Sequence, residues 1–399
     1  MLIVTRAVCG HSGGHDRTLH DVAANAGRVR FRSGAETVTG TLRSKWTAVV
    51  PIAALVALAL TWQISPEPLL AVFIGAVLVA AVLAAVHHAE IIAHRVGEPF
   101  GSLVLAVAVT VIEVALIVTL IAAGGPGSHS LARDTVFAAV MITANGIVGL
   151  ALLVGAIRHG ITRFNPEGSG AALAVIATLA TLTLVLPTFT SSRPGPEFSP
   201  LQLGFAAAAS LLLYALFVLT QTVRHRDFFL PVATHGDAVR DAHAPPPTRR
   251  AALVSLGLLG AALVSVVGLA KTVSPVIETA VTRAGIPESF VGVVIALLVL
   301  LPEGLAATRA ARLGRLQTSL NLGYGSAIAS IGLTVPAIAI ASVWIEGPLT
   351  LGLDGTQIVL LALTVAVGTL TVVPGRATRL QGSIHLVLFA AFIFLAMFP

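Results

Sequence analysis

Residues 108–120 read AVTVIEVALIVTL, an almost unbroken apolar run with a single carboxylate, Glu113, at its middle. Similar runs recur along most of the chain, and about 20 apolar residues are enough for a helix to cross a bilayer. Hydrophobic residues make up 56% of the 399 residues and charged residues 11%. This balance excludes a soluble globular domain and indicates an integral membrane protein.

The predicted spans are helices, because backbone polar groups in lipid must be satisfied within the segment and no alternating strand pattern of about ten residues occurs. Breaks at Pro, Gly and charged residues predict an all-α integral membrane protein with eleven transmembrane helices. The eleven ranges are 47–64, 69–96, 101–124, 134–157, 171–190, 201–223, 251–278, 287–309, 318–343, 350–373 and 381–398.

The apolar spans repeat internally. Residues 97–117 read GEPFGSLVLAVAVTVIEVALI, and residues 286–306 read IPESFVGVVIALLVLLPEGLA. Glu98 precedes Glu113 by fifteen residues, and Glu288 precedes Glu303 by the same fifteen. The spans therefore group as one helix followed by two sets of five. Because five is odd, the second set enters the membrane from the opposite side, which predicts two inverted repeats.

Polar segments divide the chain into five parts. The first is predicted to be a disordered cytoplasmic tail, the second an additional transmembrane helix, and the fourth a cytoplasmic linker between the two repeats. In order, the parts are residues 1–45, 46–66, 67–223, 224–250 and 251–399.

The distribution of Lys and Arg predicts the orientation. With the N-terminus in the cytoplasm, 20 of the 24 Lys and Arg residues fall in inside segments and 4 fall outside. Cytoplasmic loops carry this excess in membrane proteins. The chain is therefore expected to be a multi-pass protein of the inner (plasma) membrane, with its N-terminus inside and its C-terminus outside. The net charge of +6 then reflects topology rather than nucleic-acid binding.

Glu113 and Glu303 stand out because an ionisable side chain in the middle of a span costs about 2.5 to 3.5 kcal/mol on insertion scales, and so rarely faces lipid. Two such acids at matching positions can share one cavity, where they bind either protons or a cation. Pro302 is expected to interrupt its helix and to free backbone carbonyls near Leu298 and Val299.

Further oxygen ligands for a cation are expected from polar residues at similar depth. Each of them has the alternative role of a helix-packing residue, because small and polar side chains line helix contacts in membranes. These residues are Thr110, Asn145, Ser326 and Ser330.

These motifs resemble a known family. The quoted runs, together with LLPEGLAATRAARLGRLQTSLN at 300–321 and LYALFVLTQTVRHRDFF at 213–229, are similar to bacterial calcium/proton antiporters of the ChaA type. That type lies in the cation/proton exchanger (CAX) branch of the sodium/calcium exchanger superfamily, and the resemblance covers residues 45–399. It implies export of Ca²⁺ in exchange for protons, with Na⁺ or K⁺ as the alternative cation and with Glu113 and Glu303 as the shared site.

Three other titratable residues are candidates for gating or proton relay. Glu90 and Glu278 occupy comparable places before the two acid motifs, and His225 follows the sixth span. Imidazole titrates near physiological pH, so His225 could sense pH, although a solvated loop histidine is an equal alternative.

The predicted mechanism is alternating access, in which a cation and protons occupy the same two carboxylates in turn. No GxxxxGK[ST] or HExxH motif occurs in the sequence, and the one GxSxG match, GHSGG at 10–14, lies in the predicted tail outside the spans, so neither nucleotide hydrolysis nor an intramembrane enzyme is expected. The expected partners are inorganic cations, protons and the lipid bilayer, with no nucleic acid, no nucleotide and no resident cofactor.

Overall fold

A computed structural model of the chain describes residues 33–62, 64, 66–97, 100–123, 129–231, 247–344 and 347–399. Most of the predicted tail, residues 1–32, and most of the linker, residues 232–246, lie outside the described residues, as does Glu98. The chain divides into two compact units, Met1–Val49 and Val50–Pro399. The second unit contains both predicted repeats.

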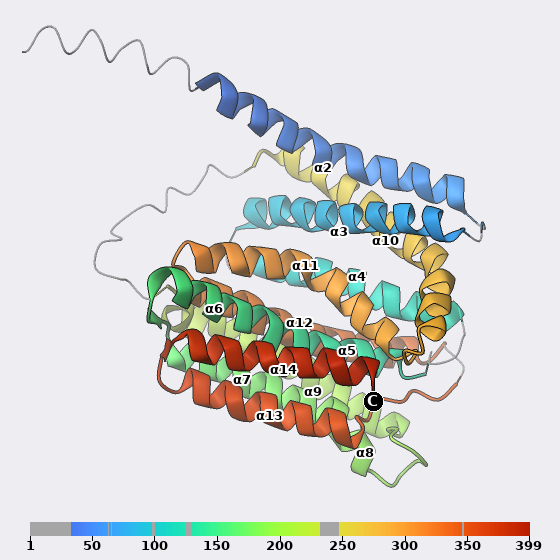
Figure 1. Ribbon diagram of the computed structural model, residues 1–399, viewed down its shortest axis with the longest axis vertical. Coiled ribbons are helices and arrows are strands. Elements are labelled where there is room, and N and C mark those ends of the chain that lie inside the picture. Colours follow the sequence, from blue (N-terminus) through green and yellow to red (C-terminus); the bar gives the residue numbers. More distant parts are fainter. Residues whose placement is uncertain are drawn as a thin grey trace, which may run out of the picture. The chain divides into compact units, whose positions relative to one another are not determined.

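The first half of this second unit consists of helices (Figure 1). They are α2 (Ser33–Thr61, which begins in the first unit), α3 (Pro68–Val96), α4 (Phe100–Ala123), α5 (Leu131–Met141), α6 (Val148–His159), α7 (Pro166–Ala180), α8 (Leu186–Phe189) and α9 (Pro200–Leu219). The π-helical segments are η1 (Ile142–Ile147), η2 (Thr181–Val185) and η3 (Thr220–Arg224), and η4 (Arg226–Phe229) is a 3-10 turn. η1 joins α5 to α6 and η2 joins α7 to α8, so each pair forms one continuous rod.

The second half contains α10 (Arg249–Arg283), α11 (Phe290–Arg312), α12 (Leu316–Ala341), α13 (Gly355–Val372) and α14 (Arg379–Met397). Two short strands, β1 (Thr162–Arg163) and β2 (Arg376–Ala377), pair antiparallel. Nine helices of the described residues are long and apolar enough to cross a membrane, and α2 and α4 contribute the shorter apolar stretches Trp46–Thr61 and Val107–Ala122. Each of the eleven predicted ranges thus coincides with a helix, while eleven as the number of spans stays a prediction.

Local sequence signals explain where several helices begin. Proline occupies the first position of α3, α7 and α9, where its missing N–H has no intrahelical partner to lose. The Asn165 side chain caps α7 by accepting from the backbone N–H groups of Glu167 and Gly168 at 2.9 and 3.3 Å. Asp354 and Gln357 form a capping box at the start of α13.

Helix interruption does not occur where the sequence led us to expect it. α11 continues through Pro302 without a break, so the expected interruption before Glu303 is wrong. The lost N–H of one proline is tolerated inside a helix that is otherwise fully bonded and packed. The irregular backbone lies instead in η1, η2 and η3, and η1 packs against α11, the helix that carries Glu303.

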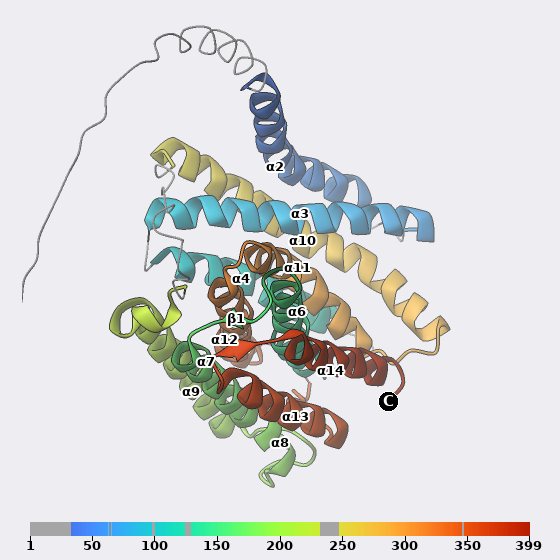
Figure 2. The same ribbon diagram turned by 60° about the vertical axis from the view of Figure 1, so that its left-hand side comes forward.

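Helix packing pairs elements of the two halves. α3 packs along α10, α4 packs on α12 while α11 packs on α5, and α9 packs on α12 while α14 packs on α6 (Figures 1 and 2). Close approach depends on glycine where α6 meets α14, because a Cβ at Gly382 would lie 2.5 Å from the backbone nitrogen of Leu153. Small residues of this kind permit tight helix contacts in membranes.

The connections between helices pair in a reciprocal way. β1 follows α6 and pairs with β2, which follows α13. At the other end of the helices, Glu197 follows α8 and forms a β-bridge with Thr350, which follows α12. Exchange of the halves turns one pairing into the other, while inverted repeats stay a prediction.

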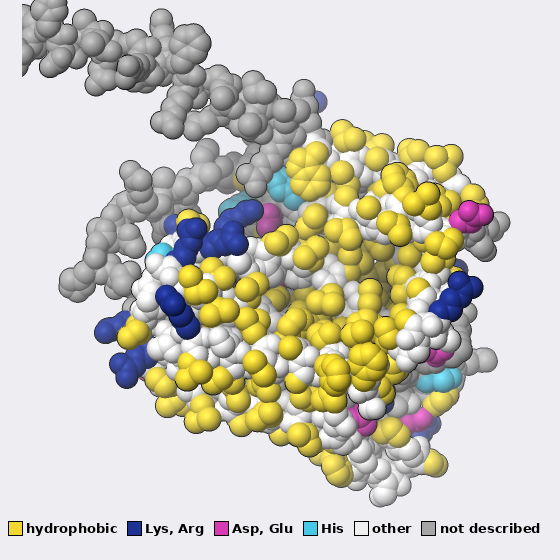
Figure 3. Space-filling view, in the orientation of Figure 1, with side chains coloured by type: hydrophobic (Ala, Val, Ile, Leu, Met, Phe, Trp, Pro, Cys, Tyr) yellow, Lys and Arg dark blue, Asp and Glu magenta, His cyan; other side chains and the backbone are white. Residues whose placement is uncertain are grey.

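Basic side chains gather at one end of the helices. Figure 3 shows Lys and Arg concentrated at the end where α13 passes into α14. Exposed arginines there include Arg158, Arg163, Arg312, Arg315 and Arg376. We call this the basic end, and the end that holds Glu197 and Thr350 the opposite end.

Candidate cation-binding site

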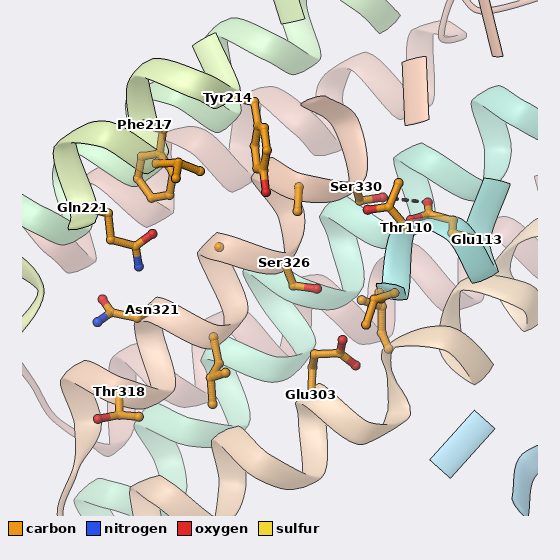
Figure 4. Close-up of a pocket in the computed structure, with 16 residues that line it drawn as sticks. Thr110, Glu113, Tyr214, Phe217, Gln221, Glu303, Thr318, Asn321, Ser326 and Ser330 are labelled. Carbon is orange, nitrogen blue, oxygen red and sulfur yellow. Dashed lines mark hydrogen bonds between the residues drawn. The ribbon is translucent and has the colours of Figure 1, made fainter. Parts of the chain in front are cut away.

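A cavity of about 220 Å³ lies between α4, α9, α11 and α12 (Figure 4). It combines helices from both halves of the chain. Its lining consists of Val109, Thr110, Glu113, Tyr214, Phe217, Val218, Gln221, Leu300, Glu303, Thr318, Asn321, Leu322, Gly325, Ser326, Ala329 and Ser330. We call it the cation cavity.

Glu113 lines the cavity from α4 and is held in place by α12. Its side chain is buried, with 4% of the residue exposed, and Oε1 accepts a hydrogen bond from the Ser330 hydroxyl at 2.6 Å. Thr110, one helical turn earlier, is also buried and lies beside this pair (Figure 4). A hydrogen bond to a charged group is stronger than one between neutral groups, so Ser330 fixes the orientation of the carboxylate.

Glu303 lines the same cavity from α11 but is held less firmly. Its Oε2 atom is buried and has no hydrogen-bond partner among the described residues. Glu303 lies within electrostatic range of Glu113. A buried acceptor without a partner is costly and therefore needs an explanation, and a bound proton or cation would supply one.

A polar stripe runs along α12 from the two carboxylates toward the basic end. Ser330, Ser326, Asn321 and Thr318 follow one another along α12, and all four line the cavity. Gln221 of η3 faces the cavity across from Asn321 (Figure 4). Because α12 begins beside the exposed Arg315, this stripe connects the carboxylates with the basic end.

No Lys, Arg or His side chain is present among the described residues that line the cavity. The two carboxylates therefore have no basic counterion in its wall. When both are ionised, the site carries two uncompensated negative charges in a region of low dielectric, where such charges are unstable. A cavity of this kind is suited to the binding of cations or protons.

The structure brings together most of the residues expected at the site. Thr110, Glu113, Glu303, Ser326 and Ser330 all line the cation cavity. Asn145 does not line it.

The Asn145 side chain is engaged elsewhere. Its Nδ2 donates to the Thr364 hydroxyl at 2.9 Å, and its Oδ1 lies 3.0 Å from Nδ1 of His385. Asn145 sits on η1, which packs against α11, α12 and α14, and its side chain is bound to Thr364 of α13 and His385 of α14 instead of facing the carboxylates.

The three candidates for gating or relay also lie outside the cavity. Glu90 is exposed on α3, within electrostatic range of both Arg309 and Glu303. Glu278 is half-buried on α10 and accepts from the Ser274 hydroxyl at 2.7 Å. His225 is exposed beyond η3 and stacks on Phe228 at 5.0 Å between ring centroids.

Sequence reasoning missed several residues of the cavity wall. Thr318 and Asn321 could have been found, because they are polar residues of the same apolar helix as Ser326 and Ser330. Gln221 and Tyr214 could not have been found in this way, since they belong to a helix far away in the sequence that reaches the cavity only through the tertiary fold.

Helices long and apolar enough to cross a membrane, around a cavity whose described wall holds two acids and no basic residue, are typical of membrane transporters of cations. Comparison with known proteins gives the same class, because the profile of the sodium/calcium exchanger protein family matches residues 66–223 and 254–398. The chain belongs to this family, whose members are cation exchangers and not enzymes.

Two relatives match nearly the whole chain. Protein y4hA of Sinorhizobium fredii, which carries the name of an ionic transporter, is 44% identical over 89% of this chain and 96% of its own length. The sodium-potassium/proton antiporter ChaA of Escherichia coli is 31% identical over 90% of this chain and 98% of its own length.

Solved structures share the fold. The structure of native YfkE matches with a TM-score of 0.66 and 15% identity, covering 89% of this chain and 99% of that one. The H⁺/Ca²⁺ exchanger CAX also matches with a TM-score of 0.66, at 16% identity, covering 89% of this chain and 92% of that one.

Proposed function

We propose that this protein is a secondary antiporter that exports Ca²⁺ from the cytoplasm in exchange for protons. One observation carries the proposal. Glu113 and Glu303, one from each half of the chain, line a single cavity whose described wall contains no basic side chain. The protein is a multi-pass membrane cation exchanger by family, and the choice of Ca²⁺ and protons rests on the chemistry of this pair.

Charge balance supports this exchange. One Ca²⁺ or two protons would each neutralise the carboxylate pair, whereas the empty pair would carry two charges through the low-dielectric interior. With a cation or with two protons bound, the site can therefore switch between facing one side of the membrane and facing the other, while the empty, doubly charged site switches poorly. This difference couples the outward flux of the cation to the inward flux of protons, and no nucleotide is required.

The oxygen donors of the cavity also suit Ca²⁺. This ion prefers about 6 to 8 oxygen ligands at roughly 2.3 to 2.6 Å, supplied by carboxylates, carbonyls, hydroxyls and water. Two carboxylates and the hydroxyls of Thr110, Ser326 and Ser330 border the same space. Water entering from the polar stripe on α12 would complete the shell.

An eleven-helix topology with two inverted repeats is part of the proposal. The family profile matches both halves, and the pairings β1 with β2 and Glu197 with Thr350 are exchanged when the halves are exchanged. With the basic end in the cytoplasm of a plasma membrane, the N-terminus is inside, the C-terminus is outside and the polar stripe opens to the cytoplasm.

A second candidate function is Na⁺/proton or K⁺/proton antiport. The name of the 31% identical relative, a sodium-potassium/proton antiporter, favours it. One monovalent cation together with one proton would also neutralise the pair, and it would need fewer oxygen ligands. The two functions share the site and differ in the cation.

Proton delivery to the site is assigned to residues outside the cavity. Glu90 is the first choice, because it is exposed at the surface and yet within electrostatic range of Glu303. Glu278 and His225 are further candidates as a gate and a pH sensor, and neither has a described contact with the cation cavity.

The test uses everted membrane vesicles that contain the protein and an internal pH dye, energised by respiration. Addition of Ca²⁺ is expected to release protons from the vesicles, while Na⁺ and K⁺ at the same concentration are not. Vesicles from cells without the protein are the control. Proton release by Na⁺ or K⁺ but not by Ca²⁺ would establish the second candidate, and no response to any cation would exclude both.

A further inference from the structure

A second, smaller pocket of about 90 Å³ lies at the opposite end, between α5, α11, α13 and α14. Its wall includes the last residue of the chain, Pro399, and Figure 1 marks the C-terminus at the end away from the α13–α14 connection. We call it the outer pocket. It shares no described lining residue with the cation cavity.

Parts of the walls of the two pockets share the same residue spacing. On α9 and the adjoining η3, the cation cavity is lined by Tyr214, Phe217, Val218 and Gln221. On α14 and just after its end, the outer pocket is lined by Phe392, Leu395, Ala396 and Pro399. Both sets follow the same steps of three, one and three residues.

The third helices of the two halves show the same correspondence. Thr318 and Asn321, in the first turns of α12, line the cation cavity, and Asp134 and Phe137, in the first turns of α5, line the outer pocket. We call the line along which two helices pack against each other a seam. The seam between α5–α6 and α14 is therefore the counterpart of the seam between α12 and α9. Because the halves are inverted, the counterpart opens at the opposite end.

The two seams differ in what fills them. Tyr214 and Asn321 border the open cation cavity. At the corresponding positions Phe392 and Phe137 are buried and pack edge to face, with ring centroids 5.6 Å apart and an interplanar angle of 83°. One open and one closed seam is the arrangement that alternating access requires.

Deeper contacts close the same seam further. One turn beyond Phe137 lies Met141, which is fully buried, and one turn beyond that Asn145 contacts His385 at 3.0 Å. A Cβ at Gly149 would lie 2.8 Å from the Cβ of His385, so the two helices are in direct contact there. The aromatic pair thus lies nearest to the outer pocket, with packed residues behind it.

We infer that the outer pocket is the mouth of the route by which the cation leaves on the side opposite the basic end, and that Phe137 and Phe392 form its closed gate. The inference rests on the proposed function. The acids at the mouth are not a second cation site, because Asp134 is bound by Arg133 and Ser130 at 2.8 Å each and Asp354 caps α13.

The route is tested by thiol labelling in a Cys9→Ser background, which removes the single cysteine of the chain. Ala396→Cys and Val218→Cys occupy corresponding positions on α14 and α9. A membrane-impermeant methanethiosulfonate is expected to label Ala396→Cys only from the side opposite the basic end, and Val218→Cys only from the basic side. Labelling of both from one side, or of Ala396→Cys from neither, overturns the route.

The gate is tested with Met141→Cys, one turn behind Phe137. Its labelling from the opposite side is expected to rise at least about tenfold when Phe392→Ala is added, since an edge-to-face pair and its buried area are lost. Phe394→Ala is the matched control, because Phe394 is an exposed phenylalanine on the same helix. An equal rise with the control, or none with Phe392→Ala, overturns the gate.

Two measures keep the outcome decisive. If Phe392→Ala does not accumulate in the membrane, Phe392→Leu replaces it, and a smaller rise in the labelling of Met141→Cys is still expected because the ring contact is lost. Labelling requires no transport, so a protein that fails the pH-dye assay but shows this labelling pattern disproves the proposed exchange and leaves the route standing.

Discussion

Glu113 and Glu303 border one cavity, yet their surroundings differ. Glu113 is buried on α4 and accepts a 2.6 Å hydrogen bond from Ser330, whereas Glu303 on α11 has a buried oxygen with no hydrogen-bond partner among the described residues. A fixed carboxylate is a preorganised ligand, and an unsatisfied one gains most from a new partner. In our proposal Glu113 orients the ion and Glu303 completes the binding.

The largest expected effect comes from removing either charge. Glu113→Gln and Glu303→Gln should each reduce cation-driven proton release to the level of vesicles without the protein, because one carboxylate can no longer be neutralised by the same exchange. The pH-dye assay measures this. Glu288→Gln, an acid of the same repeat pattern outside the cation cavity, is the control and should retain release. Persistent exchange in either cavity variant would show that the carboxylates do not act as a pair.

The next effect concerns pH. Protons and the cation compete for the same two carboxylates, so lowering the pH on the side facing the cavity should raise the cation concentration for half-maximal exchange. For each proton that the cation displaces, this half-maximal cation concentration should rise about tenfold for every unit by which the pH falls, as long as the site is protonated. Initial rates across a pH series give the slope. A half-maximal concentration independent of pH would contradict a shared site.

Loss of the hydroxyl that holds Glu113 should have a smaller effect. Ser330→Ala removes a hydrogen bond to a carboxylate, a contribution of about 1.5 to 3 kcal/mol, and should raise the half-maximal cation concentration by about tenfold or more. Ser210→Ala is the control, because Ser210 is a buried serine outside the cation cavity whose hydroxyl donates to the Ala206 carbonyl of its own helix at 2.7 Å. Equal losses in the two variants would remove the distinction between a fixed and an unfixed carboxylate.

The smallest effect is expected from Glu90, the exposed acid that interacts electrostatically with Glu303. Glu90→Gln should slow exchange by about two- to fivefold at low ionic strength without changing the cation preference, as for a partly exposed charge interaction worth up to about 1 kcal/mol. Measurement at high salt should remove most of the difference. A complete loss of exchange would make Glu90 part of the binding site and would extend the comparison to three acids.

The glutamate pair was predictable because an acid in the middle of a span is energetically costly. An acid inside a thirteen-residue run that is otherwise nearly all apolar, repeated at the same spacing in the second half, has few explanations other than a shared polar site. Asn145 shows the limit of this reasoning. An amide at the right depth on the helix after the first acid is as suitable a ligand as Ser330 on the helix after the second, but only Ser330 reaches a carboxylate.

Sequence alone determined the apolar helical segments, the surplus of Arg near particular helix ends and the matched acids. Hydropathy, charge and spacing are local properties, because each side chain partitions between lipid and water according to its own chemistry. Tertiary structure alone decided which faces of those helices meet. Rotation of a helix about its axis leaves hydropathy unchanged, but it determines whether Gln221 and Asn321 border a cavity or Phe137 and Phe392 close a seam.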